Sequence, residues 1–121
     1  MHETVRRFVE LLEARDWDGW SALLDPDVVY EMPQSRERIR GRERYLRFNR
    51  EYPTEWHLSP TRVLAEGDEG VCWFACRVGE ETVDGIVFLR RGADGLVTEV
   101  VDFWPEASEP PPGREHLVER W

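Results

Sequence analysis

The sequence lacks several features that would place it in a particular class of proteins. No apolar run approaches the ~18–20 residues of a membrane-spanning helix, so we expect no membrane partner. The opening residues do not form the apolar segment of a secretory signal, which favours a cytoplasmic location. A glycine-rich phosphate loop and a cluster of metal-ligating side chains are also missing. We therefore expect neither a cofactor nor a metal site.

Cysteine is scarce, and negative charge outweighs positive charge. The only cysteines are Cys72 and Cys76. If their segment is a strand, they share one face but lie ~13 Å apart along it, too far for a disulfide between them. We expect buried free thiols in a reducing compartment. The formal net charge is -9, because 25 acidic residues outnumber 16 basic residues, all of them arginine. Such a chain repels phosphate backbones, so we expect no nucleic-acid partner.

Helical spacing dominates the first half of the chain, whose 121 residues correspond to one domain, residues 1–121. Apolar side chains recur at helical spacing over residues 5–12, which predicts an amphipathic helix. Asp16 is a typical N-cap and predicts a second, short helix after it. Gly41 precedes a third helix, predicted over residues 42–51.

The second half of the chain has the composition and period of β-strands. Before it, residues 28–32 predict a short strand, and the polar residues 34–40 are expected to form a loop. β-Branched and aromatic runs with short, turn-rich connections predict four antiparallel strands over residues 56–64, 71–78, 82–89 and 96–104. Residues 114–121 are compatible with a short helix. Helices followed by a meander indicate an α+β fold, with a curved sheet and helices on one face.

Five segments of the chain carry a resemblance to a known family. They are residues 5–9 (VRRFV), 15–20 (RDWDGW), 23–33 (LLDPDVVYEMP), 40–43 (RGRE) and 101–105 (VDFWP). In this order and spacing they resemble the nuclear transport factor 2-like superfamily, and more narrowly its SnoaL-like polyketide cyclase and ketosteroid isomerase branch. The resemblance implies a cone-shaped, curved, mostly antiparallel sheet wrapped around three N-terminal helices, with an internal pocket. It also implies a homodimer formed through the outer face of the sheet.

The resemblance to ketosteroid isomerase does not extend to its catalytic groups. That family implies a general-base carboxylate, a tyrosine hydroxyl and a protonated carboxyl. These groups fall on Met32, Phe8 and Asp84 of this sequence. Two of the three groups are absent, so we reject the steroid isomerase mechanism as such. Glu31 neighbours Met32, but adjacent strand residues point to opposite faces unless a bulge turns one of them inward.

The resemblance to epoxide hydrolases leaves two carboxylates in place. The Asp–Arg–Asp relay of that family falls on Asp84, Thr82 and Asp102, so the bridging arginine is missing. Without it, two facing carboxylates would share a proton, which raises one pKa and lets one group act as acid and the other as base. We therefore predict Asp84 and Asp102 as the catalytic residues. For Asp84 an ion pair with Arg77 is the alternative, and Asp102 lies in the pocket only if its strand face is concave.

Six further residues are predicted to bind the substrate: Phe8, Tyr30, Met32, His57, Phe88 and Trp104. Tyr30 can donate a hydrogen bond to a ligand or simply occupy a core position. A lone histidine at a strand start, as at His57, is more often a surface or capping residue. The arginines of residues 36–50 are interleaved with glutamates, which favours a solvated face over a phosphate site.

Three classes of function remain open. One is a cofactor-independent enzyme of isomerase, cyclase or hydrolase type, which performs acid–base chemistry on a small apolar molecule. Another is a non-catalytic ligand-binding or dimeric assembly module, which the losses at Met32 and Phe8 favour. The third is a dimer whose pocket is filled by its own tryptophan side chains. A structure that shows whether Asp84 and Asp102 line one cavity would separate these classes.

Overall fold

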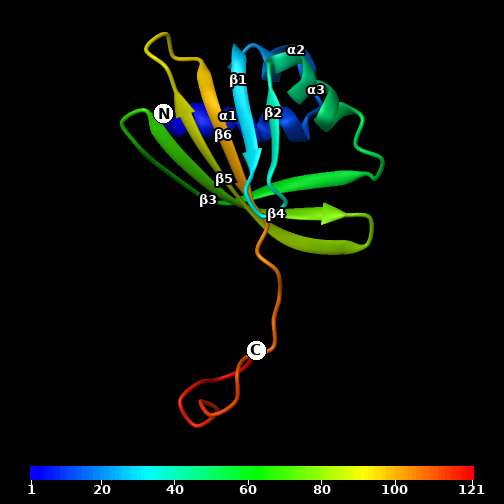
Figure 1. Cartoon of the computed structure of the whole chain (residues 1–121), viewed down its shortest axis with the longest axis vertical. Helices are drawn as coiled ribbons and strands as arrows, with labels where there is room; N and C mark the ends of the chain where they lie inside the picture. The colour runs from blue at the N-terminus through cyan, green and yellow to red at the C-terminus, as the bar shows by residue number, and fades with distance from the viewer.

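Three helices and one six-stranded sheet form the body of the computed structural model, which describes residues 1–121 (Figure 1). The helices are α1 (His2–Glu13), α2 (Trp17–Ser21) and α3 (Arg42–Arg50). The strands are β1 (Leu24–Met32), β2 (Glu37–Arg40), β3 (Trp56–Glu66), β4 (Glu69–Val78), β5 (Glu81–Arg91) and β6 (Val97–Phe103). The expected α+β fold is confirmed. None of the helices combines the length and the apolar character needed to cross a membrane.

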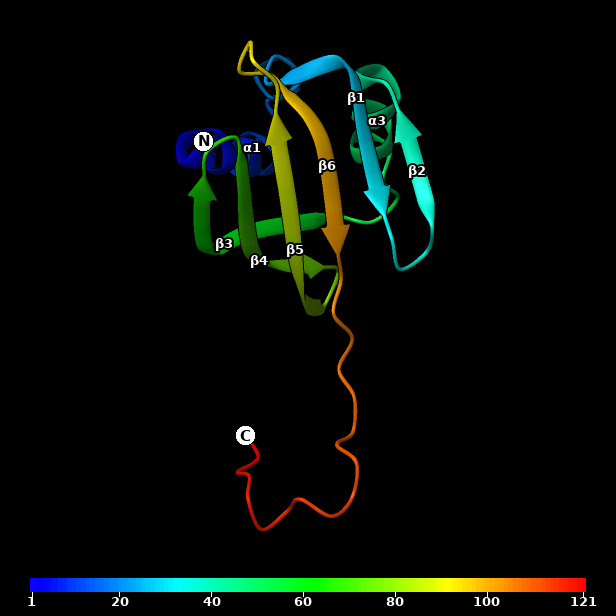
Figure 2. The same cartoon turned by 60° about the vertical axis from the view of Figure 1, so that its left-hand side comes forward.

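The strands follow the order β2-β1-β6-β5-β4-β3 across the sheet. The last four strands form the expected antiparallel meander, and β2 pairs antiparallel with β1. Only β1 and β6 run parallel. The sheet is strongly curved, and α1 and α3 lie on its concave side (Figure 2). A register irregularity between Pro60 and Arg62 lets the long strand β3 bend.

The first two helices form where local sequence signals place them. The buried apolar stripe of α1 consists of Val5, Phe8, Val9 and Leu12. This stripe packs against β3 and β4. Gly70 of β4 permits the close approach, because a Cβ atom there would collide with the Val5 side chain. Asp16 caps α2 as expected, its carboxylate accepting a hydrogen bond from the Gly19 N–H at 3.0 Å.

An aromatic stack joins the helices to β1 in the core. Tyr45 of α3 stacks on Tyr30 of β1 with ring centroids 4.6 Å apart, and Trp20 of α2 lies 5.0 Å from Tyr45. All three side chains are buried. Such pairs stabilise a core by ~0.5–1.5 kcal/mol beyond the burial of their area. Cys72 and Cys76 are buried free thiols, as expected.

Three local expectations are wrong. Residues 37–40 are not a loop but the edge strand β2, with Ile39 opposite Tyr30. Three of these four side chains, Glu37, Arg38 and Arg40, are charged and suit a solvated edge, which hides the strand pattern in the sequence. β1 begins earlier than expected, at Leu24, with an irregular register before Val29. Residues 114–121 contain turns and no helix, because so short a segment gains no packing to offset the cost of helix nucleation.

Candidate active site

An apolar cavity of about 490 Å³ lies between the helices and the concave face of the sheet. Of its 21 lining residues, 16 are hydrophobic. Its aromatic walls are Phe8, Tyr30, Tyr45, Phe48, Tyr52, Trp56, Phe74 and Trp104. Two carboxylates belong to the lining, the half-buried Asp102 and the exposed Glu106. A cavity of this size and composition suits a small apolar molecule.

Asp102 is the carboxyl group that β6 turns into the cavity. Strand alternation puts it on the same face as Val100 and Trp104, so the face carrying Asp102 is the concave one. Tyr30 on the neighbouring strand β1 donates a hydrogen bond from its hydroxyl to Asp102 Oδ2 at 2.8 Å. Burial raises the pKa of the Asp102 carboxyl to about 7, although the hydrogen bond from Tyr30 acts in the opposite direction. This carboxyl therefore titrates near neutral pH.

Tyr30 is held in place as a hydrogen-bond donor. Its side chain is buried, stacked on Tyr45 and tilted against Phe48 at a centroid distance of 5.6 Å. Burial and the nearby Asp102 carboxylate raise the pKa of the Tyr30 hydroxyl well above its ordinary value. The hydroxyl thus stays protonated and fixes one oxygen of Asp102. No donor of the chain reaches the other oxygen, Oδ1, which is left for a ligand.

The expected partner carboxylate, Asp84, lies on the opposite side of the sheet. On β5, Val83 and Val87 line the cavity, whereas Asp84 and Phe88 are exposed and absent from the lining. The expectation that Asp84 and Phe88 face the pocket is therefore wrong. The pleat of β5 decides this, because neighbouring side chains of a strand point to opposite faces. The two carboxylates cannot share a proton, and the raised pKa of Asp102 arises from burial instead.

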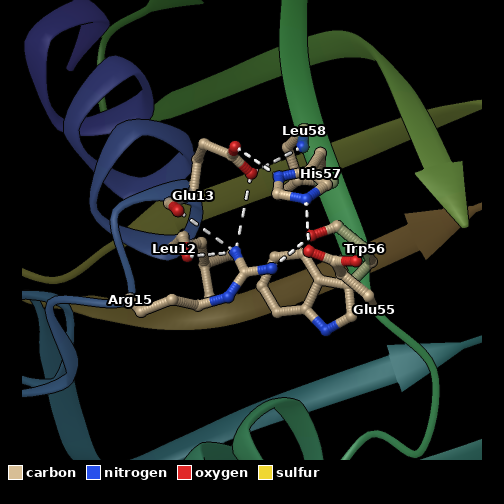
Figure 3. A network of polar contacts seen from close by, with 7 residues as sticks. All are labelled: Leu12, Glu13, Arg15, Glu55, Trp56, His57 and Leu58. Carbon is tan, nitrogen blue, oxygen red and sulfur yellow. Dashed lines mark hydrogen bonds and ion pairs between the residues drawn. The ribbon is translucent and has the colours of Figure 1, made fainter.

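His57 belongs to a polar network between the end of α1 and the start of β3, and not to the cavity lining (Figure 3). Its Nδ1 lies 2.9 Å from Glu13 Oε2, and its Nε2 lies 3.0 Å from Glu55 Oε1. Glu13 also accepts the Leu58 N–H at 2.8 Å. Trp56 and Leu58 line the cavity, so strand alternation turns His57 away from it. The expected place of His57 in the pocket is wrong.

The same network holds one wall of the cavity. The Arg15 guanidinium lies over the Trp56 ring, 3.5 Å from its centroid, and donates a hydrogen bond to the Trp56 backbone carbonyl (Figure 3). Hydrogen bonds with Glu13 and Glu55 raise the pKa of His57 above its ordinary value of 6.5. Protonated His57 therefore helps to anchor β3, and with it Trp56, to the end of α1.

Part of the predicted pocket coincides with the cavity. Phe8, Tyr30, Met32 and Trp104 line it, and their role in substrate binding stays a prediction. Sequence reasoning missed the residues Tyr45, Phe48, Tyr52, Phe74 and Cys76. The helical spacing of the first three was visible, but it did not show which element their face meets. Phe74 and Trp104 meet edge to face at 5.4 Å, and Gly85 leaves the room for both rings.

The chain is similar to several known proteins. The family model of the SnoaL-like domain matches residues 5–100. A candidate ketosteroid isomerase from Kribbella flavida DSM 17836 superposes with a TM-score of 0.97 and 52% identity, over 99% of this chain and 88% of that chain. A LEH-like epoxide hydrolase from M. tuberculosis superposes with a TM-score of 0.69 and 25% identity, over 86% of this chain and 81% of that chain. The uncharacterized protein YesE of Bacillus subtilis (strain 168) is 26% identical over 116 residues, 84% of this chain and 79% of YesE.

We expect the Asp102→Asn substitution to stabilise the protein at alkaline pH. The folded protein keeps the Asp102 proton up to about pH 7, whereas an ordinary aspartate loses it near 3.8. The contribution of Asp102 to stability therefore falls as the pH rises between these values. Asparagine removes this titration and still accepts the hydrogen bond from Tyr30. Urea unfolding at about pH 8 should give the variant an unfolding free energy about 2 kcal/mol above wild type, with no gain below about pH 4.

Asp84→Asn is the matched control, because Asp84 is exposed on the other face of the sheet. Its unfolding free energy should stay within about 0.5 kcal/mol of wild type at both pH values. An Asp102→Asn variant less stable than wild type at about pH 8 would contradict a buried carboxyl that resists ionisation.

We expect the stabilising effect of His57 to disappear as the pH rises. Because the pKa of His57 is raised in the folded state, its contribution is complete below about pH 6.5 and is lost as the pH passes the raised pKa. His57→Gln should therefore lower the urea midpoint at about pH 5 and have a smaller effect at about pH 9. An equal loss at both pH values would show that the histidine acts through its shape alone.

Proposed function

This chain belongs to the SnoaL-like domain family, and from that premise we propose that it binds a small apolar molecule and moves a proton on it. The cavity supplies the binding site, and the Asp102 carboxyl supplies the acid–base group. The proposal is carried by the hydrogen-bonded Asp102–Tyr30 pair inside a mainly apolar lining. A carboxyl pKa of about 7 supports it, because both protonation states are populated near neutral pH.

A single carboxyl group in an apolar lining suits a reaction in which one proton changes place. Ionised Asp102 accepts a proton from a carbon next to a ketone, and the resulting acid returns the proton to a different carbon of the same molecule. Tyr30 positions the carboxyl through Oδ2 and leaves Oδ1 for the substrate. Hydration of an epoxide would call for a second group to activate water, and Asp84 points away from the cavity. We therefore favour isomerase-type or cyclase-type chemistry over hydrolysis.

A non-catalytic ligand-binding module is the second candidate function. Met32 and Phe8 line the cavity at the two positions where the resemblance to ketosteroid isomerase implies a base and a tyrosine. Both side chains add apolar contact area and no acid–base group. A protein that had kept only the binding function would show this pattern, with Asp102 as a polar anchor for the ligand.

We also propose that two copies associate through the outer face of the sheet. Trp73, Ile86 and Phe103 are direct neighbours across β4, β5 and β6 on this face. Trp73 is 39% exposed and Phe103 is 36% exposed, so the row presents apolar surface to water.

We propose the cytoplasm as the place of action. The free thiols Cys72 and Cys76 favour a reducing compartment, which supports this location.

The catalytic proposal is tested with cyclic β,γ-unsaturated ketones of increasing ring number, whose conversion to the conjugated enone is followed by ultraviolet absorbance. We expect kcat/KM to rise with pH through an inflection near about pH 7, as Asp102 ionises. Asp102→Asn should lower kcat/KM by about 10²–10⁴-fold, while Asp84→Asn keeps the wild-type value. Tyr30→Phe should move the inflection to higher pH. The hydrogen bond from Tyr30 stabilises the ionised Asp102 carboxyl, and this substitution removes it.

Ligand binding, followed by tryptophan fluorescence, separates the two candidate functions. Saturable binding of the ketones without turnover by the wild-type protein would favour the ligand-binding module. Equal turnover by the wild-type protein and Asp102→Asn would contradict Asp102 as the acid–base group.

The dimer is tested by sedimentation velocity. Trp73→Glu should convert the dimer to a monomer, because it places a charge within the apolar row of the outer face. Asp84→Asn, on the same face, should leave the dimer intact. A wild-type protein that sediments as a monomer at micromolar concentration would refute the interface.

A further inference from the structure

Residues 105–121 form a tail that leaves the cone at the end of β6 (Figures 1 and 2). Gln34, in the turn between β1 and β2, fixes the point of departure. Its side-chain amide donates a hydrogen bond to the Trp104 carbonyl at 2.9 Å, and its Oε1 accepts the Trp104 N–H. Pro105 follows directly, and residues 110–112 are three further prolines, which stiffen the segment into an extended spacer. The direction of the tail is therefore restricted.

The tail has no polar contact with its own body but carries uncovered apolar side chains. Every hydrogen bond and ion pair of residues 106–121 joins two residues of the tail. Leu117 is 76% exposed, Val118 is 46% exposed and Trp121 is fully exposed. Three such side chains within five positions, at the far end of a stiff spacer, mark a contact surface.

The path of the tail is shared with a crystal structure. The Kribbella flavida protein superposes over 99% of this chain with a TM-score of 0.97. A tail on another path would not allow this score, because residues 105–121 make up about a seventh of the chain. A terminal segment that is not tied to its own body is ordinarily disordered, so one common path indicates that contacts outside the chain hold it. A second copy of the same chain is a partner that is available to each of the two proteins.

The outer face of the sheet offers a groove that fits these side chains. It is lined by a row of neighbours across β3 to β6, namely Leu64, Val71, Phe88 and Val101. Leu64 is 58% exposed and Phe88 is 47% exposed. This row lies beside the row of Trp73, Ile86 and Phe103, so a dimer through that row would bring the groove close to the partner. We call it the outer groove.

The outer groove is acidic. The acidic residues at the outer groove are Glu66, Glu69 and Glu99. Its one arginine, Arg90, is already paired with two of them, at 2.8 Å from Glu69 and 3.2 Å from Glu99. The groove therefore keeps a net negative charge. In the tail, Arg114 and Arg120 are balanced by Glu115 and Glu119. Arg120 also lies 3.9 Å from Glu109, so the apolar side chains of the tail, and not its charge, are what match the groove.

We propose that residues 105–121 are an arm that packs on a second copy of this chain, with Leu117, Val118 and Trp121 in the outer groove of that copy. In a two-fold dimer each chain gives one arm and receives one. The inference rests on the proposed dimer for the presence of the second copy, and it adds an exchanged contact that the sheet-to-sheet interface does not contain.

Disulfide trapping between two different chains tests the arm. A tagged Val118→Cys chain and an untagged Leu64→Cys chain are refolded together and oxidised. We expect a covalent heterodimer on a non-reducing gel. Cys72 and Cys76 should not interfere, because both are buried and burial raises the pKa of each thiol. As a control, the untagged chain carries Asp84→Cys in place of Leu64→Cys. Asp84 lies on the same face but outside the outer groove, so this pair of chains should give no heterodimer.

The strength of the dimer provides the second readout. The double variant Leu117→Ser, Trp121→Ser should raise the dissociation constant about tenfold or more, whereas Glu119→Gln, within the same segment, should leave it unchanged. A disulfide that forms only within a single chain carrying both Val118→Cys and Leu64→Cys would overturn the arm. A dimer of unchanged strength without trapped heterodimer would also overturn it, while leaving the proposed sheet interface standing. A monomeric wild-type protein would overturn both.

Discussion

The parallel pairing of β1 with β6 is the contact on which the shape and the candidate chemistry both depend. It joins β1, the strand that follows the first two helices, to the last strand of the meander, so that one sheet curves around the cavity. The same pairing sets Tyr30 beside Asp102, and the two side chains form the hydrogen bond of the candidate site. A parallel pair cannot be closed by a tight turn, and here the connection contains α3 and four other strands.

The fold creates acid–base character by burying one carboxyl group among apolar side chains. An ionised carboxylate loses hydration there, and a single hydrogen bond from Tyr30 offsets only part of that cost. Tyr30 stacks on Tyr45, and Trp20 packs against Tyr45 at a tilt. These contacts stabilise the core and also keep the Tyr30 donor rigid. Stability and the proposed chemistry therefore make opposite demands on Asp102, as is common at functional sites.

Local patterns predicted local structure, and they failed wherever a distant partner decides the outcome. The stripe of α1, the Asp16 cap and the four strands of the meander were all visible in the sequence, because each depends on spacing within one segment. The family resemblance supplied the cone. Asp84 and Asp102 looked equivalent, since both lie in apolar strands, and only the pleat and curvature of the sheet separate an outward carboxylate from an inward one.

By itself the sequence determined the class of fold, most of the elements and an aromatic-rich interior, because hydrophobic spacing and turn chemistry act over a few residues. The tertiary structure decided which carboxyl is buried and that His57 anchors β3 instead of meeting a ligand. It also decided that residues 37–40 extend the sheet and that residues 105–121 stand away from the body. These outcomes depend on contacts between side chains that are far apart in the chain. Strand register and the curvature of the sheet determine which of these side chains come together. The spacing of residues within one segment encodes neither of the two.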